Sequence, residues 1–198
     1  MTARQWVGIA VLALLGIGLW RGAQAPESKQ PKGEHPAPIE RPENDIPVVE
    51  GVAIINGEIN YAQFNGFVAM MAQHSEIKRL RISSHGGLVP AARAIARQVQ
   101  LHQIEVEAAG LCASACILVF MAGEKRVLAQ GAELGFHRWH DGGMAHLFGQ
   151  LDPEERDAEW LRGRGVDPQF VTQIFTTPHD NLWRPTRAEL LAAGVLTQ

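Results

Sequence analysis

Short β-branched runs alternate with segments of helical periodicity over most of the chain. This alternation predicts an α/β domain in which parallel strands are joined by right-handed helical crossovers. In such sheets ligands bind beyond the carboxyl ends of the strands, so the residues after each strand are examined first for chemistry. The predicted strands are 48–55 (with a turn into a second short strand), 78–83, 104–109, 125–128 and 134–136; the predicted helices are 61–74, 88–101, 114–122, 153–162, 168–175 and 186–193.

The N-terminal segment holds an unbroken apolar run from Val7 to Trp20, flanked by Arg4 and Arg21. Its 14 residues fit the hydrophobic region of a signal peptide and fall short of the roughly 20 that a spanning helix needs. The triplet Ala-Gln-Ala at 23–25 is typical of a cleavage site, whereas the proline after it disfavours cleavage.

Two interpretations of this segment stay open. It is either a signal peptide (residues 1–25) or an uncleaved membrane anchor at residues 6–20, with a tryptophan at each membrane interface. A buried core helix is disfavoured because the run has no polar stripe. Both favoured interpretations place the rest of the chain outside the cytoplasm, in the periplasm or another extracytoplasmic space, either secreted or anchored to the inner membrane.

Residues 26–47 hold six of the 11 prolines, interleaved with charged and amide side chains. Such a composition buries too little apolar surface to offset its ordering entropy, so a disordered linker is expected here. The remaining residues, 48–198, form the predicted α/β domain. With 46% hydrophobic residues in the chain, this part is large enough for one core.

Composition excludes several classes of protein. The 18 basic and 21 acidic residues give a formal charge of -3, which argues against sequence-independent binding of nucleic acid. Only 2 cysteines are present, which excludes a disulfide-stapled miniprotein and a thiolate zinc cluster.

Two segments that follow predicted strands carry residues suited to catalysis. In the first, Gly86 and Gly87 allow backbone N–H groups to approach a ligand and face a developing negative charge, although a plain tight turn fits as well. In the second, Ser114 stands near the start of a short apolar helix, where free N–H groups stabilise an anion. The same serine could simply cap that helix.

A third segment places His137 after the last predicted strand, where a neutral imidazole could take the Ser114 proton if the two strand ends are neighbours. His137 with His140 and Asp141 could instead contribute to a metal site, but no further ligand completes a familiar spacing, and a surface histidine pair is the plainer alternative. A base also needs an orienting acid. Spacing alone does not choose among the aspartates that follow: Asp141, Asp152, Asp157, Asp167 and Asp180.

The order of these features resembles the Clp protease proteolytic subunit of the ClpP/crotonase superfamily. The similarity extends from about Val52 to Thr197 and rests on ISSHGG (82–87), CASACILVFMAG (112–123), ELGFH (133–137) and, more weakly, HDNLWRPTRAELLAAGVL (179–196). It implies a spiral of ββα units. His85 departs from the family, which has proline there, and so do the two residues that follow Ser114.

The resemblance implies a serine peptidase with Ser114 as nucleophile, His137 as general base and Asp180 as the acid that orients it. The oxyanion hole would be formed by the N–H groups of Gly87 and Ala115, with Gly86 shaping the turn. The G-x-S-x-G motif of α/β-hydrolases is absent, because the nearest preceding glycine is four residues before Ser114.

Together with the export segment, the resemblance points to the predicted periplasmic ClpP-like serine proteases. It implies a peptide or protein substrate and no cofactor or metal. A homo-oligomer is expected, formed through the helical insertion at 138–177, and membrane contact through the N-terminal segment. No ATPase partner is expected, because an exported site has no ATP-driven unfoldase.

Cys112 and Cys116 flank Ser114. Either a disulfide or two small buried thiols fits the sequence, and both alternatives stay open.

Two other functions are considered. A non-catalytic ClpP-like module that binds peptides or a partner would be recognised by a Ser114 hydroxyl out of hydrogen-bond reach of His137. Acyl-CoA chemistry of the crotonase type is disfavoured, because a second glycine-rich acyl-CoA pocket is missing and coenzyme A is not expected outside the cytoplasm.

Overall fold

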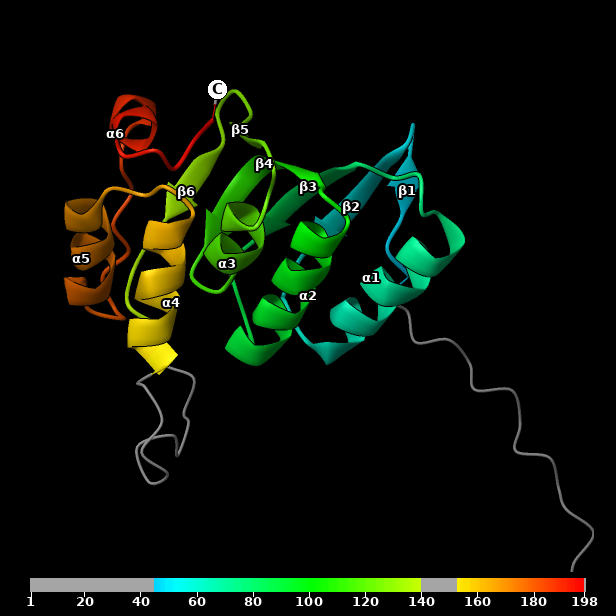
Figure 1. The fold of residues 1–198 in the computed structure, drawn as a ribbon, viewed down its shortest axis with the longest axis horizontal. Coiled ribbons are helices and arrows are strands. Elements are labelled where there is room, and N and C mark those ends of the chain that lie inside the picture. Colours follow the sequence, from blue (N-terminus) through cyan, green and yellow to red (C-terminus); the bar gives the residue numbers. More distant parts are fainter. Residues whose placement is uncertain (1–44, 140–152, 198) are drawn as a thin grey trace, which may run out of the picture. The chain divides into compact units, whose positions relative to one another are not determined.

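The structure is a computed structural model that describes residues 45–139 and 153–197, all within one compact unit (Figure 1). The predicted export or anchor segment, most of the predicted linker, His140, Asp141 and Asp152 lie outside the described residues. No helix in the described part is long and apolar enough to cross a membrane.

A six-stranded sheet forms the centre, in the order β1-β2-β3-β4-β5, with β6 also paired to β4 (Figure 1). The β1-β2 pair is antiparallel and every other pair is parallel, so the predicted mixed α/β class is confirmed. The strands are β1 (Val48–Val49), β2 (Val52–Asn56), β3 (Arg79–Ser84), β4 (Glu105–Ala113), β5 (Arg126–Leu128) and β6 (Glu133–Gly135); the helices are α1 (Tyr61–Gln73), α2 (Val89–Leu101), α3 (Cys116–Met121), α4 (Pro153–Gly163), α5 (Pro168–Thr176) and α6 (Arg187–Ala192).

The first predicted strand is in fact a hairpin. Glu50 and Gly51 both have positive φ, 51° and 73°, which is the backbone of a tight two-residue turn between β1 and β2. Beyond β2, Ile59 forms a single β-bridge with Gly87. This bridge becomes important because it holds the glycine turn of the site.

The length of β4 was also predicted wrongly, and the reason is Gly110. The sequence suggested that the strand ends at Ala109, but it continues to Ala113. Gly110 has φ +152°, and the pairing with β3 changes register beside it, so the glycine marks a bulge instead of an end. Beyond the bulge, β4 leaves β5 and pairs with β6, which redirects its last residues toward the candidate site.

The core explains why a helix as short as α3 is stable. All six of its residues are buried, so tertiary packing replaces the length that an isolated helix would need. The neighbouring helix α2 buries three alanines among its core-facing residues, which lets it lie close to its neighbours. Its buried residues are Val89, Ala91, Ala92, Ile95, Ala96 and Val99.

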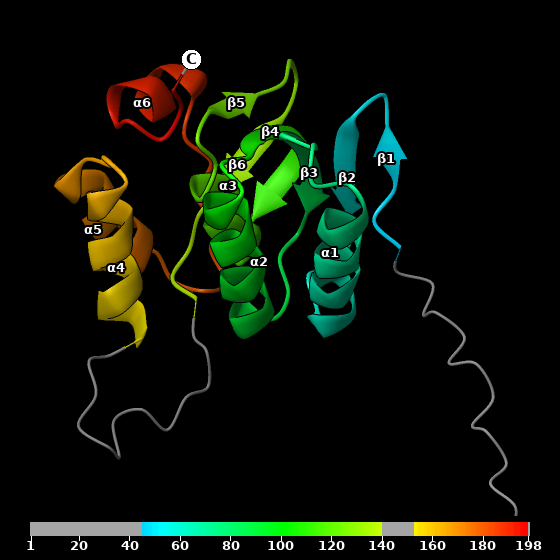
Figure 2. The same cartoon turned by 45° about the vertical axis from the view of Figure 1, so that its right-hand side comes forward.

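The last three helices begin where the sequence predicted. Pro153 is the first residue of α4, Asp167 caps α5 by accepting hydrogen bonds from two backbone N–H groups, and Thr186 forms a capping box with Glu189 in α6. In both views these helices lie at the β6 end of the sheet, while α1 lies at the β1 end (Figures 1 and 2). They therefore pack near the end of the sheet that carries His137.

Two arginines, the buried Arg126 and the partly buried Arg164, attach this C-terminal part to the sheet through backbone carbonyl groups. Arg126 donates to the carbonyls of Gly194 and Val195, and Arg164 donates to those of Met121 and Gly123. Burial lowers the pKa of Arg126, and the neighbouring Arg164 charge lowers it further, against a raising effect of Glu124. These bonds stabilise the chain end and the end of α3.

Candidate active site

Ser114 lies at the sharp turn between β4 and α3. Its φ is +56°, a conformation that non-glycine residues rarely adopt and that costs of order 1–3 kcal/mol. Its N–H donates to the Gly135 carbonyl at 3.1 Å, and its carbonyl accepts from Ile117 N at 2.9 Å. The N-cap of α3 is Ala115, so the interpretation of Ser114 as a capping serine is wrong.

A serine with positive φ between a strand and a helix has the backbone of a nucleophile elbow, although the usual glycine motif is absent. The space that such a turn needs comes from Gly86 on the opposite segment. A Cβ at Gly86 would lie 2.8 Å from Ser114 Cβ and 3.2 Å from Ala115 N. The glycine turn can therefore lie directly against the serine and the N–H group that follows it.

The glycine turn is itself fixed by several hydrogen bonds. Ser84 Oγ accepts from Gly86 N at 3.0 Å and donates to the Gly86 carbonyl at 3.2 Å. Ile59 N also donates to the Gly86 carbonyl, at 2.8 Å. Gly86 and Gly87 have φ of 111° and 140°, and a Cβ at Gly87 would lie only 2.2 Å from the Ile59 carbonyl oxygen. Both positions thus require glycine.

Two backbone donors, one directly after Ser114 and one directly after Gly86, have no acceptor in the described part of the chain. Within the described residues, neither Gly87 N–H nor Ala115 N–H donates a hydrogen bond to another backbone group or side chain. Preorganised N–H groups without acceptors are what an oxyanion hole offers to the negative charge of a tetrahedral intermediate.

The pairing of β4 with β6 brings the histidine segment to the serine. Ala113 is the register partner of Gly135, so Ser114 and His137 follow the same ends of two hydrogen-bonded parallel strands. This is the neighbour relation that the sequence-based hypothesis required. His85, by contrast, is exposed.

His137 is 6% exposed and is held in one tautomer by its neighbour. Its Nδ1–H donates to the Arg138 carbonyl at 2.8 Å, which leaves Nε2 as the unprotonated nitrogen of the neutral ring. Burial lowers the pKa of His137, the hydrogen bond to the Arg138 carbonyl raises it, and the nearby His179 lowers it. A neutral imidazole with a free Nε2 is the form that can accept a proton.

The predicted third residue is not engaged with the histidine. Asp180 is exposed in a turn, and no hydrogen bond or ion pair joins it to another described residue. Its neighbour His179 lies against His137 instead, with ring centroids 4.6 Å apart. Likewise, no hydrogen bond joins Ser114 Oγ to His137 among the described side chains. The role of Asp180 stays a prediction.

Cys112 and Cys116 are bonded in a disulfide, with an S–S distance of 2.05 Å and Cα atoms 5.4 Å apart. The pairing is possible because Cys112 belongs to a strand and Cys116 to a helix, so the turn at Ser114 folds the two back toward each other. Both residues are fully buried. The disulfide therefore closes a small ring of chain around the candidate nucleophile.

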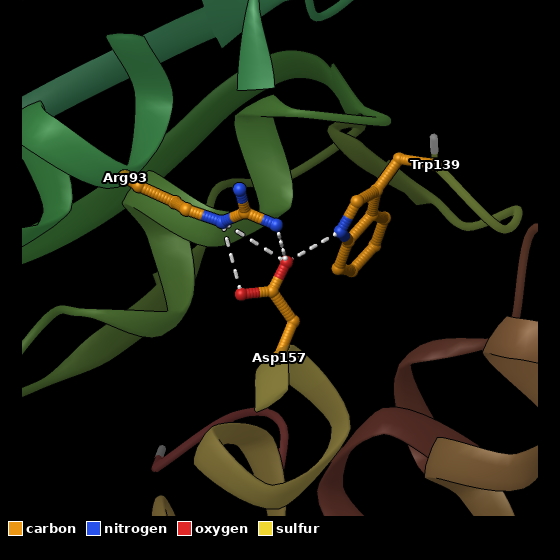
Figure 3. A network of polar contacts seen from close by, with 3 residues as sticks. All are labelled: Arg93, Trp139 and Asp157. Atoms are coloured by element: carbon orange, nitrogen blue, oxygen red, sulfur yellow. Dashed lines mark hydrogen bonds and ion pairs between the residues drawn. The ribbon is translucent and has the colours of Figure 1, made fainter. Parts of the chain in front are cut away.

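The sequence-based reasoning missed a buried polar network that joins Trp139, two residues after His137, to Asp157 and Arg93 (Figure 3). Asp157, 5% exposed, accepts from Trp139 Nε1 at 2.8 Å and from Arg93 Nη2 at 2.6 Å. Asp157 was one of five candidate acids. Its spacing could have indicated that it is buried, because it lies four residues before the apolar Leu161 and therefore on the same, core-facing side of α4.

The described residues contain no group of three or more His, Cys, Asp or Glu side chains that could hold a metal ion. His140 and Asp141, which entered the metal-site alternative, lie outside the described residues.

No protein-family model and no curated protein matches the sequence. Solved structures do match: ClpP1 from Listeria monocytogenes has a TM-score of 0.61 at 19% identity, over 74% of this chain and 88% of that chain. A point mutant of the same ClpP1 has a TM-score of 0.59 at 19% identity, over 73% and 88%. At such identity the likeness establishes the fold alone. The chain therefore has a ClpP-like fold, as its motifs predicted.

Proposed function

We propose that this protein is an exported or membrane-tethered serine hydrolase, a ClpP-like peptidase with Ser114 as nucleophile and His137 as general base. One observation carries the proposal: Ser114 has a strained φ of +56° and lies against Gly86, and the N–H groups of the next residues, Ala115 and Gly87, have no acceptor in the described part of the chain. Backbone strain of this kind persists where the surroundings enforce it, which is common in active sites.

In the proposed mechanism, His137 Nε2 takes the Ser114 proton as Oγ attacks a peptide carbonyl. The N–H groups of Gly87 and Ala115 donate to the oxyanion that forms. The imidazolium then gives its proton to the departing amine, and water hydrolyses the acyl-enzyme by the same route in reverse. The Arg138 carbonyl accepts from Nδ1–H throughout, and this bond strengthens when the ring is charged.

Asp180 is the acid that the resemblance implies for this mechanism. Since its side chain is exposed and has no bond to His137 in the described structure, the acceptor for Nδ1–H is assigned to the Arg138 carbonyl.

The proposed location rests on two features that agree. The apolar run from Val7 to Trp20 predicts export, either as a signal peptide or as an anchor at 6–20. The Cys112–Cys116 disulfide supports it, because such bonds persist in oxidising compartments. We propose peptide or protein substrates, a homo-oligomer formed through the segment that carries α4 and α5, and no ATPase partner.

A second function, a non-catalytic peptide- or partner-binding module, is favoured by one observation. Ser114 Oγ has no hydrogen bond to His137 among the described residues, which is the feature expected of an inactive site. Catalytic hydrogen bonds are often long in ligand-free enzymes, so a chemical test must decide between the two functions.

The test is covalent labelling of the full-length protein with a fluorophosphonate, followed by mass mapping of the adduct. We expect a single adduct on Ser114 that is absent in Ser114→Ala and forms at least about 100-fold more slowly in His137→Gln. Ser83→Ala is the matched control, since this serine lies one residue before the end of β3, outside the proposed mechanism, and its loss should leave labelling unchanged. A folded sample that does not react would favour the binding module.

A further inference from the structure

We propose that Asp157 is a positioning residue for His137, acting through the Trp139 indole and the Arg138 carbonyl. The inference rests on the proposed function, because it assigns the element that holds the general base. In this arrangement no carboxylate contacts the histidine directly. Instead, a buried carboxylate holds the peptide unit whose carbonyl accepts a hydrogen bond from the imidazole, and we call this chain of contacts the relay.

The first step is the bond between His137 Nδ1–H and the Arg138 carbonyl, at 2.8 Å. The Arg138 carbonyl and the Trp139 N–H belong to one planar peptide unit. A contact that holds Trp139 in place therefore restricts the rotation of the peptide unit whose oxygen accepts from the imidazole.

The second step is the hold on Trp139. Its side chain is 2% exposed, its ring meets Phe175 edge-on at a centroid distance of 5.1 Å, and its Nε1–H donates to Asp157 Oδ2 at 2.8 Å. On the other side, Arg138 N donates to the Thr177 carbonyl at 3.0 Å. The accepting peptide unit is thus secured from both sides.

The third step is the rigidity of Asp157 itself (Figure 3). A carboxylate that is 5% exposed needs compensation for its lost hydration, and Arg93 supplies it through Nε to Oδ1 at 3.1 Å and Nη2 to Oδ2 at 2.6 Å. Arg93 stands on α2, whose first residue is two positions after Gly87. The network therefore ties the histidine segment to the helix that follows the oxyanion turn.

Helix packing alone does not explain this choice of residues. A buried ion pair adds little stability over apolar side chains of similar volume, so it is weak evidence of a stabilising role. The Trp139 Nε1–H bond also adds direction, which an apolar contact lacks. Elsewhere in the fold, Arg164 holds α3 through carbonyl oxygens alone and has no contact with the histidine segment in the described residues.

The test compares three variants of the full-length protein by the tautomer of His137, read from its imidazole ¹⁵N shifts and assigned with His137→Gln. Trp139→Phe keeps an aromatic ring and removes only the N–H donor. Asp157→Asn keeps an acceptor but removes its charge. Arg164→Gln is the control, since it also removes partly buried hydrogen bonds, but ones that lie outside the relay.

We expect the Nδ1–H tautomer in the wild type and in Arg164→Gln, and a mixture with Nε2–H in Trp139→Phe. The fluorophosphonate rate should fall about tenfold in Trp139→Phe and less in Asp157→Asn, with the loss in kcat and not in KM once a substrate is in hand. Urea unfolding of each variant separates these losses from a change in stability.

Several outcomes decide the matter. If Trp139→Phe keeps the wild-type tautomer and labelling rate, the relay is wrong and the proposed function stands. If the tautomer changes but no variant, wild type included, reacts with the probe, the relay is supported and the proposed function fails. If Asp180→Asn disturbs the tautomer and Trp139→Phe does not, Asp180 is the orienting group and the relay is overturned.

Discussion

The serine side and the histidine side of the candidate site are held by different kinds of interaction. On the serine side the backbone sets the geometry: Ser114 has positive φ, Gly86 lies against it, and the disulfide closes the turn. On the histidine side, the only hydrogen bond of the His137 ring among the described residues is to the carbonyl of the next residue, Arg138. The wider support comes from side chains on α2 and α4, 64 residues apart in the sequence.

This difference explains which half the sequence could predict. The glycines and cysteines of the serine side lie together within 82–116, so the sequence identifies the residues of this side, although not the positive φ of Ser114. The histidine side depends on a contact between Arg93 and Asp157 that no local pattern specifies. A substitution that displaces the serine-side backbone should therefore cost more activity than one that weakens the contacts around His137.

The largest effect is expected for Gly87→Ala. The new Cβ would meet the Ile59 carbonyl oxygen at 2.2 Å, so the turn must move and take its oxyanion donor with it. We expect the fluorophosphonate rate to fall about 100-fold or more, the usual cost of losing one oxyanion donor. Gly131→Ala is the control, because Gly131 also has positive φ but no atom within 4 Å of its Cβ position. Equal labelling in both variants would contradict the assignment of the hole.

The next effect is expected from removal of the disulfide by the double substitution Cys112→Ala and Cys116→Ala. The small ring around Ser114 should contribute about 2 kcal/mol to the free energy of unfolding by chain entropy, measurable by urea denaturation. The strained turn should relax part of the time, so labelling slows. A reductant should reproduce both effects in the wild type and do nothing to the double variant. Unchanged labelling in the double variant would show that packing alone holds the turn.

Helix boundaries were the most predictable part of the fold. The starts at Pro153, Asp167–Pro168 and Thr186 were correct because caps and prolines act locally. The end of β4 and the conformation of Ser114 were not, because the pairing of β4 with β6 overrides the local tendency of glycine to end a strand and of serine to cap a helix. For the site, the motifs predicted the neighbourhood of Ser114 and His137, while the Trp139–Asp157 contact requires the tertiary fold.

A smaller effect concerns pH. Burial lowers the pKa of His137 from the model-peptide value of 6.5. In a plot of labelling rate against pH, the midpoint of the fall on the acidic side should therefore lie below pH 6.5. The same shift makes His137 stabilise the fold above pH 6.5 and destabilise it as the pH falls through the folded-state pKa, since the unfolded chain binds the proton more readily.

His179→Phe sharpens this prediction. The substitution keeps a ring against His137 but removes the electrostatic effect of His179 that lowers the pKa of His137. The acidic fall in labelling rate should therefore move toward higher pH, without a change in the plateau rate. A midpoint at or above pH 6.5 in the wild type would mean that His137 is solvated during the reaction.

The smallest effect is expected for Asp180→Asn. The side chain is exposed and bonds to no described residue, and the Nδ1–H of His137 already has its acceptor in the Arg138 carbonyl. Labelling rate, tautomer and stability should therefore stay close to wild type, with Asp167→Ala as a contrasting variant that loses the α5 cap and about 1 kcal/mol of stability. A large loss of labelling in Asp180→Asn at unchanged stability would restore Asp180 as the acid of a triad. The histidine side would then depend on a residue of the 177–181 turn, and the proposed contrast between a backbone-built serine side and a relay-built histidine side would be wrong.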